Sequence, residues 1–182
     1  MGLSSLKDEP VDRAIIEQML EAANWGQSHG DTEPWRFTVF SGTGREKLAE
    51  LYGEAYKANA GDQYKEESYQ AHRARAYAAP VWISIGMQPG LNDDGTLEMT
   101  EEEELMAVAT AAQNLHLVAS NSGLAGMWHS KGVSIHPAVA AGLNLTGHAK
   151  LLGFFFFGWP SKDWPEGERK PVSEKVTWVE TA

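Results

Sequence analysis

The segment SHGDTEPWRF, residues 28–37, joins a helical pattern to a strand pattern. Before it, Asp12 is a suitable helix N-cap, and the residues that follow repeat the i, i+3, i+4, i+7 spacing of one buried helix face: Ile16, Met19, Leu20 and Ala23. After Pro34, side chains alternate from Trp35 to Phe40, which predicts a strand. By itself the segment is compatible with a plain surface turn and with a ligand-binding loop.

The rest of the chain shows further helix and strand patterns. Strands are predicted at 81–87, 126–129 and 151–159, helices at 45–59, 69–78, 100–122 and before Gly142, and loops at 60–67 and 88–99. Thr100 and Glu103 form a capping box at the start of the longest helix, which is apolar on most sides and therefore expected to be central and buried. Because these elements follow no regular βαβ repeat, the chain is predicted to be a single α+β domain with helices packed on a small sheet.

Composition limits the class of protein. The 182-residue chain is 42% hydrophobic and 22% charged, which is the range of globular proteins. It has no cysteine, so disulfide scaffolds and thiolate chemistry are excluded. The formal charge of −10 disfavours nucleic acid as a partner, because phosphate backbones would repel the protein. The apolar run 151–160 is half the length of a membrane helix and the first residues lack a signal-peptide run, so we expect a cytoplasmic protein without a membrane anchor.

Two motifs that could carry chemistry have simpler structural explanations. Ser41–Gly44 is glycine-rich and precedes a helix, but it lacks the phosphate-binding fingerprints, and a plain turn explains it. Glu101–Glu104 cannot converge on one metal ion, because neighbouring helix residues point in different directions, and their place at a helix start explains them. The six histidines show no metal-binding spacing, so no metal is expected. The seven tryptophans are expected in the core and at an interface.

Two histidines stand beside serines in loop or short-strand positions. Ser28 and His29 begin the opening segment, and Trp128, His129 and Ser130 follow a glycine-rich stretch. Each histidine alone would most simply be a surface residue. No nucleophile motif of the Ser-His-Asp or G-x-S-x-G kind accompanies them. From the residues alone, the sequence indicates an α+β domain with two His/Ser loops and names no reaction.

Taken in order along the chain, a set of segments resembles the nitroreductase family of FMN-dependent NAD(P)H oxidoreductases, and it is most similar to the small bacterial members. The PWRF loop and the glycine-rich stretch that leads to Trp128 are the most specific parts. The full set covers nearly the whole chain: residues 7–12, 22–25, 28–37, 79–81, 113–115, 123–128, 151–154, 158–160, 164–167 and Pro171.

The resemblance implies a nitroreductase-like α+β fold, with a central antiparallel or mixed sheet flanked by helices, in a homodimer that holds FMN at the subunit interface. It implies that NAD(P)H reduces the flavin, which then reduces a nitroaromatic, quinone or related acceptor in a ping-pong cycle, so no catalytic side chain is expected. Residues 120–125 match the nicotinamide region, and the extension at about 160–182 is expected to pack on the partner subunit. The residues expected at the cofactor are Ser28, His29, Trp128, His129, Ser130 and, from charge and position, Arg169.

A second reading stays open beside the enzyme. Family members usually begin with a helix that ends in Arg-Arg-Ser shortly before the position of Pro10, and those side chains hold the FMN phosphate; here Met1 stands near that place. Close relatives also tend to have arginine at the position of His129 and glycine at that of Lys131. The alternative is therefore a non-catalytic ligand-binding dimer on the same fold that has lost strong FMN binding. Cations that could substitute are Lys7, Arg13, Lys131, Arg169 and Lys170.

Overall fold

The computed structural model describes residues 5–163 and 167–180, and its centre is a four-stranded sheet. The strands lie in the order β1-β2-β4-β3, with bounds Trp35–Ser41, Val81–Met87, Lys150–Gly158 and Ala125–His129 respectively. All three strand pairings are antiparallel. The predicted α+β class is therefore confirmed, and the sheet is antiparallel rather than mixed.

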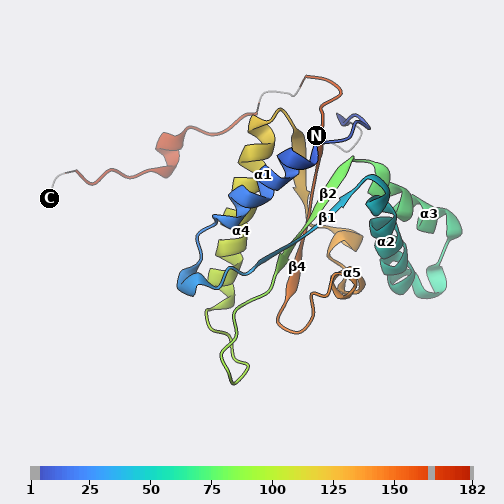
Figure 1. The fold of residues 1–182 in the computed structure, drawn as a ribbon, viewed down its shortest axis with the longest axis horizontal. Coiled ribbons are helices and arrows are strands. Elements are labelled where there is room, and N and C mark those ends of the chain that lie inside the picture. The colour runs from blue at the N-terminus through green and yellow to red at the C-terminus, as the bar shows by residue number, and fades with distance from the viewer. Residues whose placement is uncertain (1–4, 164–166, 181–182) are drawn as a thin grey trace.

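Two long helices, α1 at Arg13–Asn24 and α4 at Glu101–Asn121, cover one face of the sheet (Figure 1). Asp12 caps α1 by accepting a hydrogen bond from an amide of its first turn, as predicted. Thr100 and Glu103 close the predicted capping box of α4. Apolar residues of both helices and of the sheet beneath them form one continuous buried cluster, which fixes α4 against the sheet.

Three further helices, α2 at Arg45–Ala60, α3 at Glu66–Ala74 and α5 at Pro137–Gly142, lie on the opposite side of the sheet (Figure 1). They enclose a second buried cluster that is rich in aromatic rings. Trp82 and Phe154 are fully buried there, with ring centroids 6.3 Å apart and an edge-on arrangement. The molecule is therefore built as one sheet between two apolar layers.

The predicted helix at 69–78 is displaced in the structure. It starts earlier, at Glu66, and gives way to a 3-10 turn at Arg75–Tyr77. Glu66 and Glu67 favour the positive end of a helix dipole, which explains the earlier start. The predicted loop at 60–67 is correspondingly shorter.

The expectation that α4 is buried on most sides is wrong for a single chain. One face packs on the sheet, while Met106 and Leu117 on the other face are 60% and 57% exposed. Large apolar side chains exposed on a helix, here beside the exposed polar side chains of Thr110 and Gln113, are a usual sign of a surface that another molecule covers. Like every other helix in residues 5–163 and 167–180, α4 is not long and apolar enough to cross a membrane.

The tryptophans divide between the core and the surface. Trp82 and Trp35 are buried, as expected. Trp25 and Trp178 are each 78% exposed, so they do not belong to the core of one chain. Trp164 lies outside the described residues.

Residues 167–180 leave the body of the molecule as an extended tail (Figure 1). The tail contains one 3-10 turn, at Val172–Lys175, and no strand among its described residues. Its apolar side chains face solvent, with Val172, Trp178 and Val179 exposed by 73%, 78% and 87%. These apolar side chains of the tail are therefore not buried within their own chain.

Candidate functional site

Residues 28–34, the loop that precedes β1, have an uncommon backbone conformation. Gly30, Asp31 and Glu33 all have positive φ angles, of 65°, 54° and 43°. Only glycine adopts this region without steric cost, so Asp31 and Glu33 carry local strain. Strain of this kind persists only where surrounding contacts hold the chain in place.

Several hydrogen bonds hold this loop. The hydroxyl of Ser28 accepts from the amide of Glu33 at 3.4 Å, and the Glu33 carbonyl accepts from Nη1 of Arg36 at 2.8 Å. The carbonyl of Pro34 accepts from the amide of Gln88 at 2.7 Å, which extends the pairing of β1 with β2 by one step. The loop therefore enters the sheet in a defined direction.

His29 is held by the first turn of α4. Its Nδ1 lies 2.8 Å from Oε1 of Glu103, whose other oxygen accepts hydrogen bonds from the amide and the hydroxyl of Thr100. The hydrogen bonds from Thr100, followed by the one from His29, lower the pKa of Glu103 to about 2. Glu103 is thus a carboxylate at neutral pH, and His29, whose side chain is 69% exposed, has a fixed anionic partner.

Trp128 lies on β3 and faces α4. Its indole Nε1 donates a hydrogen bond to the Leu152 carbonyl at 3.0 Å, and its ring packs against the cluster beneath α1 and α4. Together with Ala109 and Gln113 of α4, it lines a hollow of about 300 Å³ between this helix and β3. Trp128 therefore ties the end of β3 to β4 while one side of its ring stays accessible.

His129, the next residue of β3, points to the opposite face, because side chains alternate along a strand. There its Nε2 accepts a hydrogen bond from Nη2 of Arg75 at 2.8 Å. Arginine has only donors, so this bond requires the neutral imidazole. Burial, followed by the positive charge of Arg75, lowers the pKa of His129 below its ordinary value of 6.5. Sequence reasoning missed Arg75, because no local pattern separates it from Arg73.

The surroundings of Arg75 contain buried polar atoms without a hydrogen-bond partner in the described part of the chain: Arg75 Nε, the Tyr52 hydroxyl and the Ser134 hydroxyl. Tyr52 and Ser134 are fully buried, and burial raises the pKa of Tyr52. Arg75 is only partly buried, so it is the member of this group that also reaches the surface.

The predicted cofactor residues form two groups. Ser28 and His29 precede β1, whereas Trp128, His129 and Ser130 lie at the end of β3. The two strands are the outer ones of the sheet, so three strand spacings, or about 14 Å, separate them. Within a single chain, one group therefore leads into one outer strand and the other ends the opposite outer strand.

Arg169, the remaining predicted residue, lies in the tail. It is exposed, and its Nη1 donates to the carbonyl of Glu168 at 2.8 Å. The fold of one chain therefore gives Arg169 no place in either group.

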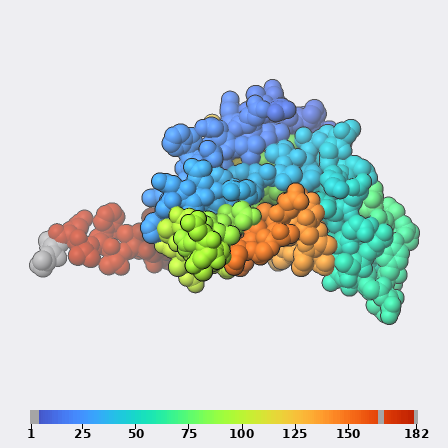
Figure 2. Space-filling model, turned by 60° about the horizontal axis from the view of Figure 1, so that its bottom comes forward, coloured from blue at the N-terminus to red at the C-terminus, as the bar shows by residue number. Residues whose placement is uncertain are grey.

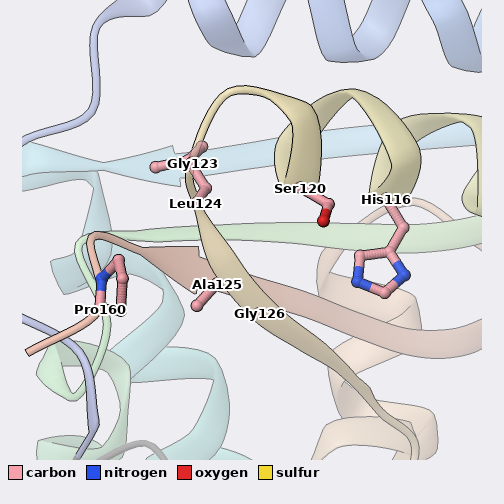
Figure 3. Close-up of a pocket in the computed structure, with 7 residues that line it drawn as sticks. All are labelled: His116, Ser120, Gly123, Leu124, Ala125, Gly126 and Pro160. Atoms are coloured by element: carbon pink, nitrogen blue, oxygen red, sulfur yellow. The ribbon is translucent and has the colours of Figure 1, made fainter. Parts of the chain in front are cut away.

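The stretch predicted to match the nicotinamide region, residues 120–125, lines a pocket of about 240 Å³ (Figure 3). Ser120 and His116 come from α4, while the start of β3 and Pro160 form the other wall (Figure 3). Burial lowers the pKa of His116. The lining is therefore uncharged near neutral pH and offers a hydroxyl and an imidazole.

The side chains of Glu101–Glu104 contact separate partners. Glu101 pairs with Lys150, and Glu104 accepts from the hydroxyl of Thr32 at 2.8 Å. These separate partners agree with the explanation that Glu101–Glu104 stand at the start of a helix, where acidic side chains favour the helix dipole. Across residues 5–163 and 167–180, no group of three or more His, Cys, Asp or Glu side chains is arranged to hold a metal ion.

Comparison with known sequences gives a consistent result. A family model described as "Nitroreductase family" matches residues 4–159. The chain is 27% identical over 177 residues to a Bacillus subtilis (strain 168) protein named "Putative NAD(P)H nitroreductase YfhC", which covers 97% of this chain and 88% of the relative.

Solved structures share the fold at low sequence identity. A nitroreductase-like family protein from Bacillus cereus superposes with a TM-score of 0.77 and 23% identity, over 100% of this chain and 92% of the other. The FMN-dependent nitroreductase NfnB from Mycobacterium smegmatis, solved in complex with NADPH, superposes with a TM-score of 0.67 and 18% identity, over 99% and 94%.

Proposed function

The chain belongs to the nitroreductase family of NAD(P)H-dependent flavin oxidoreductases, and we propose that it uses FMN to pass electrons from NAD(P)H to a nitroaromatic, quinone or related acceptor. The family match over residues 4–159 and the curated relative support this proposal. The bound flavin would supply the redox chemistry, and the protein would supply position and electrostatics. Reduction by NAD(P)H and oxidation by the acceptor would alternate at one site, as in a ping-pong cycle. The use of NAD(P)H supports a cytoplasmic setting.

The observation that carries the proposal is the cationic cluster at the end of β3. FMN has a phosphate, ribityl hydroxyls and a ring edge with oxygen and nitrogen acceptors, and such a group needs donors and fixed cations. Arg75 offers a guanidinium whose buried Nε has no partner among the described residues. Ser130 and Lys131 are exposed directly after His129. These residues fit an oxygen-rich cofactor, and we assign Arg75, His129 and Ser130 to hold it.

Within this arrangement, each protein group has a simple task. Trp128 fixes β3 through its bond to the Leu152 carbonyl, so that His129 is presented at a constant place. His129 accepts from Arg75 and thereby orients the guanidinium. The uncharged pocket at residues 120–125 lies on the α4 side of β3, so it would take a part of the nicotinamide nucleotide away from Arg75 and His129.

We propose that Ser28 and His29 complete the site from a second copy of the chain. The support is that the two groups adjoin opposite outer strands of the sheet. Arg169, exposed in the tail, would then contribute a cation to the FMN phosphate.

A homodimer is part of the proposal. The outer face of α4 exposes Met106 and Leu117, and the tail exposes Trp178 and Val179. Burying such side chains stabilises an interface by about 25 cal/mol per Å² of apolar surface. We propose that α4 faces the partner and that the extension at about 160–182 packs on the partner subunit.

Absorption spectroscopy and calorimetry of the purified protein test the proposal. We expect a flavin absorption band, one FMN per chain and oxidation of NADH or NADPH in the presence of a quinone or a nitroarene. A protein that binds no FMN and oxidises neither nucleotide would sink it. The non-catalytic alternative predicts a dimer with weak or no FMN binding, and the name of the curated relative does not favour it.

A further inference from the structure

Glu104 is a buried carboxyl group that the proposed reaction does not use. It lies in the first turn of α4 and is 1% exposed. Its Oε2 accepts a hydrogen bond from the hydroxyl of Thr32 at 2.8 Å, and its Oε1 accepts one from the amide of Gly90 at 3.0 Å. One side chain therefore joins α4 to two loops, 28–34 and 88–99, that lie far apart in the sequence.

The two loops also pack directly on each other. Figure 2 shows the green-yellow residues of loop 88–99 lying against the light-blue residues near position 30. A Cβ at Gly90 would lie 2.8 Å from Cγ2 of Thr32, and a Cβ at Gly30 would lie 2.6 Å from Cε of Met99. A side chain at Gly90 would therefore crowd Thr32, whereas Gly30 is required mainly by its φ of 65°, because Cε of Met99 is the end of a flexible side chain.

The hydrogen bond between Thr32 and Glu104 lies at the strained part of loop 28–34. Thr32 stands between Asp31 and Glu33, the two non-glycine residues with positive φ. Each such residue costs on the order of 1 kcal/mol, which the surroundings must offset. The hydroxyl of Thr32 anchors this stretch to the buried Glu104, and His29 makes a second contact with the same helix turn through Glu103.

We propose that Glu104 is a positioning residue that holds loop 28–34 in the strained conformation in which Ser28 and His29 meet the cofactor. The expected effect on FMN binding rests on the proposed function. The hydrogen bonds by which Glu104 holds loop 28–34 do not depend on that function. Because Oε1 of the same carboxyl group binds Gly90, displacement of loop 88–99 would be transmitted to the cofactor loop.

The test compares matched variants of the full chain. Glu104→Gln replaces one acceptor oxygen by an amide donor, and Thr32→Val removes the hydroxyl at nearly constant shape. Thr32→Ser keeps the hydroxyl, and Glu102→Gln changes an exposed glutamate of the same helix turn. Two quantities are measured, the amide hydrogen exchange of residues 28–34 in the free protein and the FMN dissociation constant from quenching of flavin fluorescence.

We expect Glu104→Gln and Thr32→Val each to speed exchange in residues 28–34 and to weaken FMN binding by about tenfold, while exchange in α1 stays unchanged. Thr32→Ser and Glu102→Gln should match the wild type in both quantities. A merely structural role would lower the unfolding temperature without a selective change in this loop. If Glu104→Gln does not fold, Thr32→Val carries the test.

Two outcomes overturn the inference. The first is unchanged exchange in loop 28–34 for both Glu104→Gln and Thr32→Val, and the second is faster exchange in these variants with an unchanged FMN dissociation constant. A wild-type protein that binds no FMN contradicts the proposed function instead. In that case the exchange data alone decide whether Glu104 clamps the loop, since faster exchange supports the clamp and unchanged exchange overturns it.

Discussion

Nη2 of Arg75 donates a hydrogen bond to Nε2 of His129 across 2.8 Å, joining the turn before β2 to the end of β3. The pair is 54 residues apart in sequence and lies on the sheet face opposite Trp128. The hydrogen bond places the positive charge of Arg75 at the end of β3, where the sequence by itself indicates only His129 and Ser130.

The first prediction concerns the cation of this pair. Arg75→Gln should weaken FMN binding by about 10- to 100-fold, because a charge-assisted hydrogen bond contributes roughly 1.5–3 kcal/mol. Arg73→Gln is the matched control, since Arg73 lies close by at the end of α3 but pairs with Glu46. Calorimetric titration with FMN measures both variants. Equal FMN affinity in Arg75→Gln and wild type would remove Arg75 from the site.

The second prediction concerns pH. The pKa of His129 is lowered in the folded protein, so the unfolded chain binds its proton first as pH falls below 6.5. The free energy of unfolding is therefore undiminished above pH 6.5 and decreases below it. Urea unfolding between pH 7.5 and 5 should show a shallower decrease for His129→Gln than for wild type. The exposed His148→Gln serves as the control and should follow the wild type; an identical pH slope in His129→Gln contradicts the argument.

The third prediction concerns Gly153 of β4, which pairs beside the bulge in the β2–β4 register. Its φ is +126°, and a Cβ there would overlap the His129 carbonyl oxygen and lie 2.9 Å from Nε1 of Trp128. Gly153→Ala should destabilise the protein by about 3 kcal/mol and displace His129. Gly44→Ala, where a Cβ meets open space, should change stability by less than about 0.5 kcal/mol. Chemical denaturation measures both, and similar effects at the two positions would refute the steric reason.

The fourth prediction concerns the tail. If it packs on a partner subunit, Trp178→Ala should raise the dimer dissociation constant by about 30-fold or more, as expected for an anchoring tryptophan. Trp25 has the same 78% exposure, but its Nε1 bonds to Glu21 of α1, so Trp25→Ala controls for the loss of an exposed indole. Analytical ultracentrifugation over a dilution series provides the constants. No difference between the two variants would count against a role of the tail in dimerisation.

Local features of the fold were predictable because their causes are local. The capping bonds of Asp12 and Thr100 form within three residues, and the apolar run at 81–87 is long enough to mark a buried strand. The boundary of α3 was less predictable. Its start depends on how far two glutamates favour the helix dipole, and its end is a 3-10 turn, which differs little from an α-helix in sequence.

The candidate site was predictable only in part. His29 and His129 were found from their neighbouring serines and the family resemblance, but their partners were not. Glu103 lies 74 residues from His29, and Arg75 lies 54 residues from His129. No spacing rule connects such pairs, since their distance depends on the packing of α4 and on the turn before β2.

The sequence by itself therefore determined the elements of this protein, its α+β class and its membership of the nitroreductase family. Helix caps, hydrophobic periodicity and turn residues depend on neighbouring positions, so they can be recognised from the sequence. Only the tertiary structure decided the strand order, which sets β1 and β3 at opposite edges, and the buried position of Glu104 beneath Thr32, 72 residues away. These relations arise when the helices pack on the sheet. Apolar side chains are then buried, and polar groups find hydrogen-bond partners, between segments that share no local pattern.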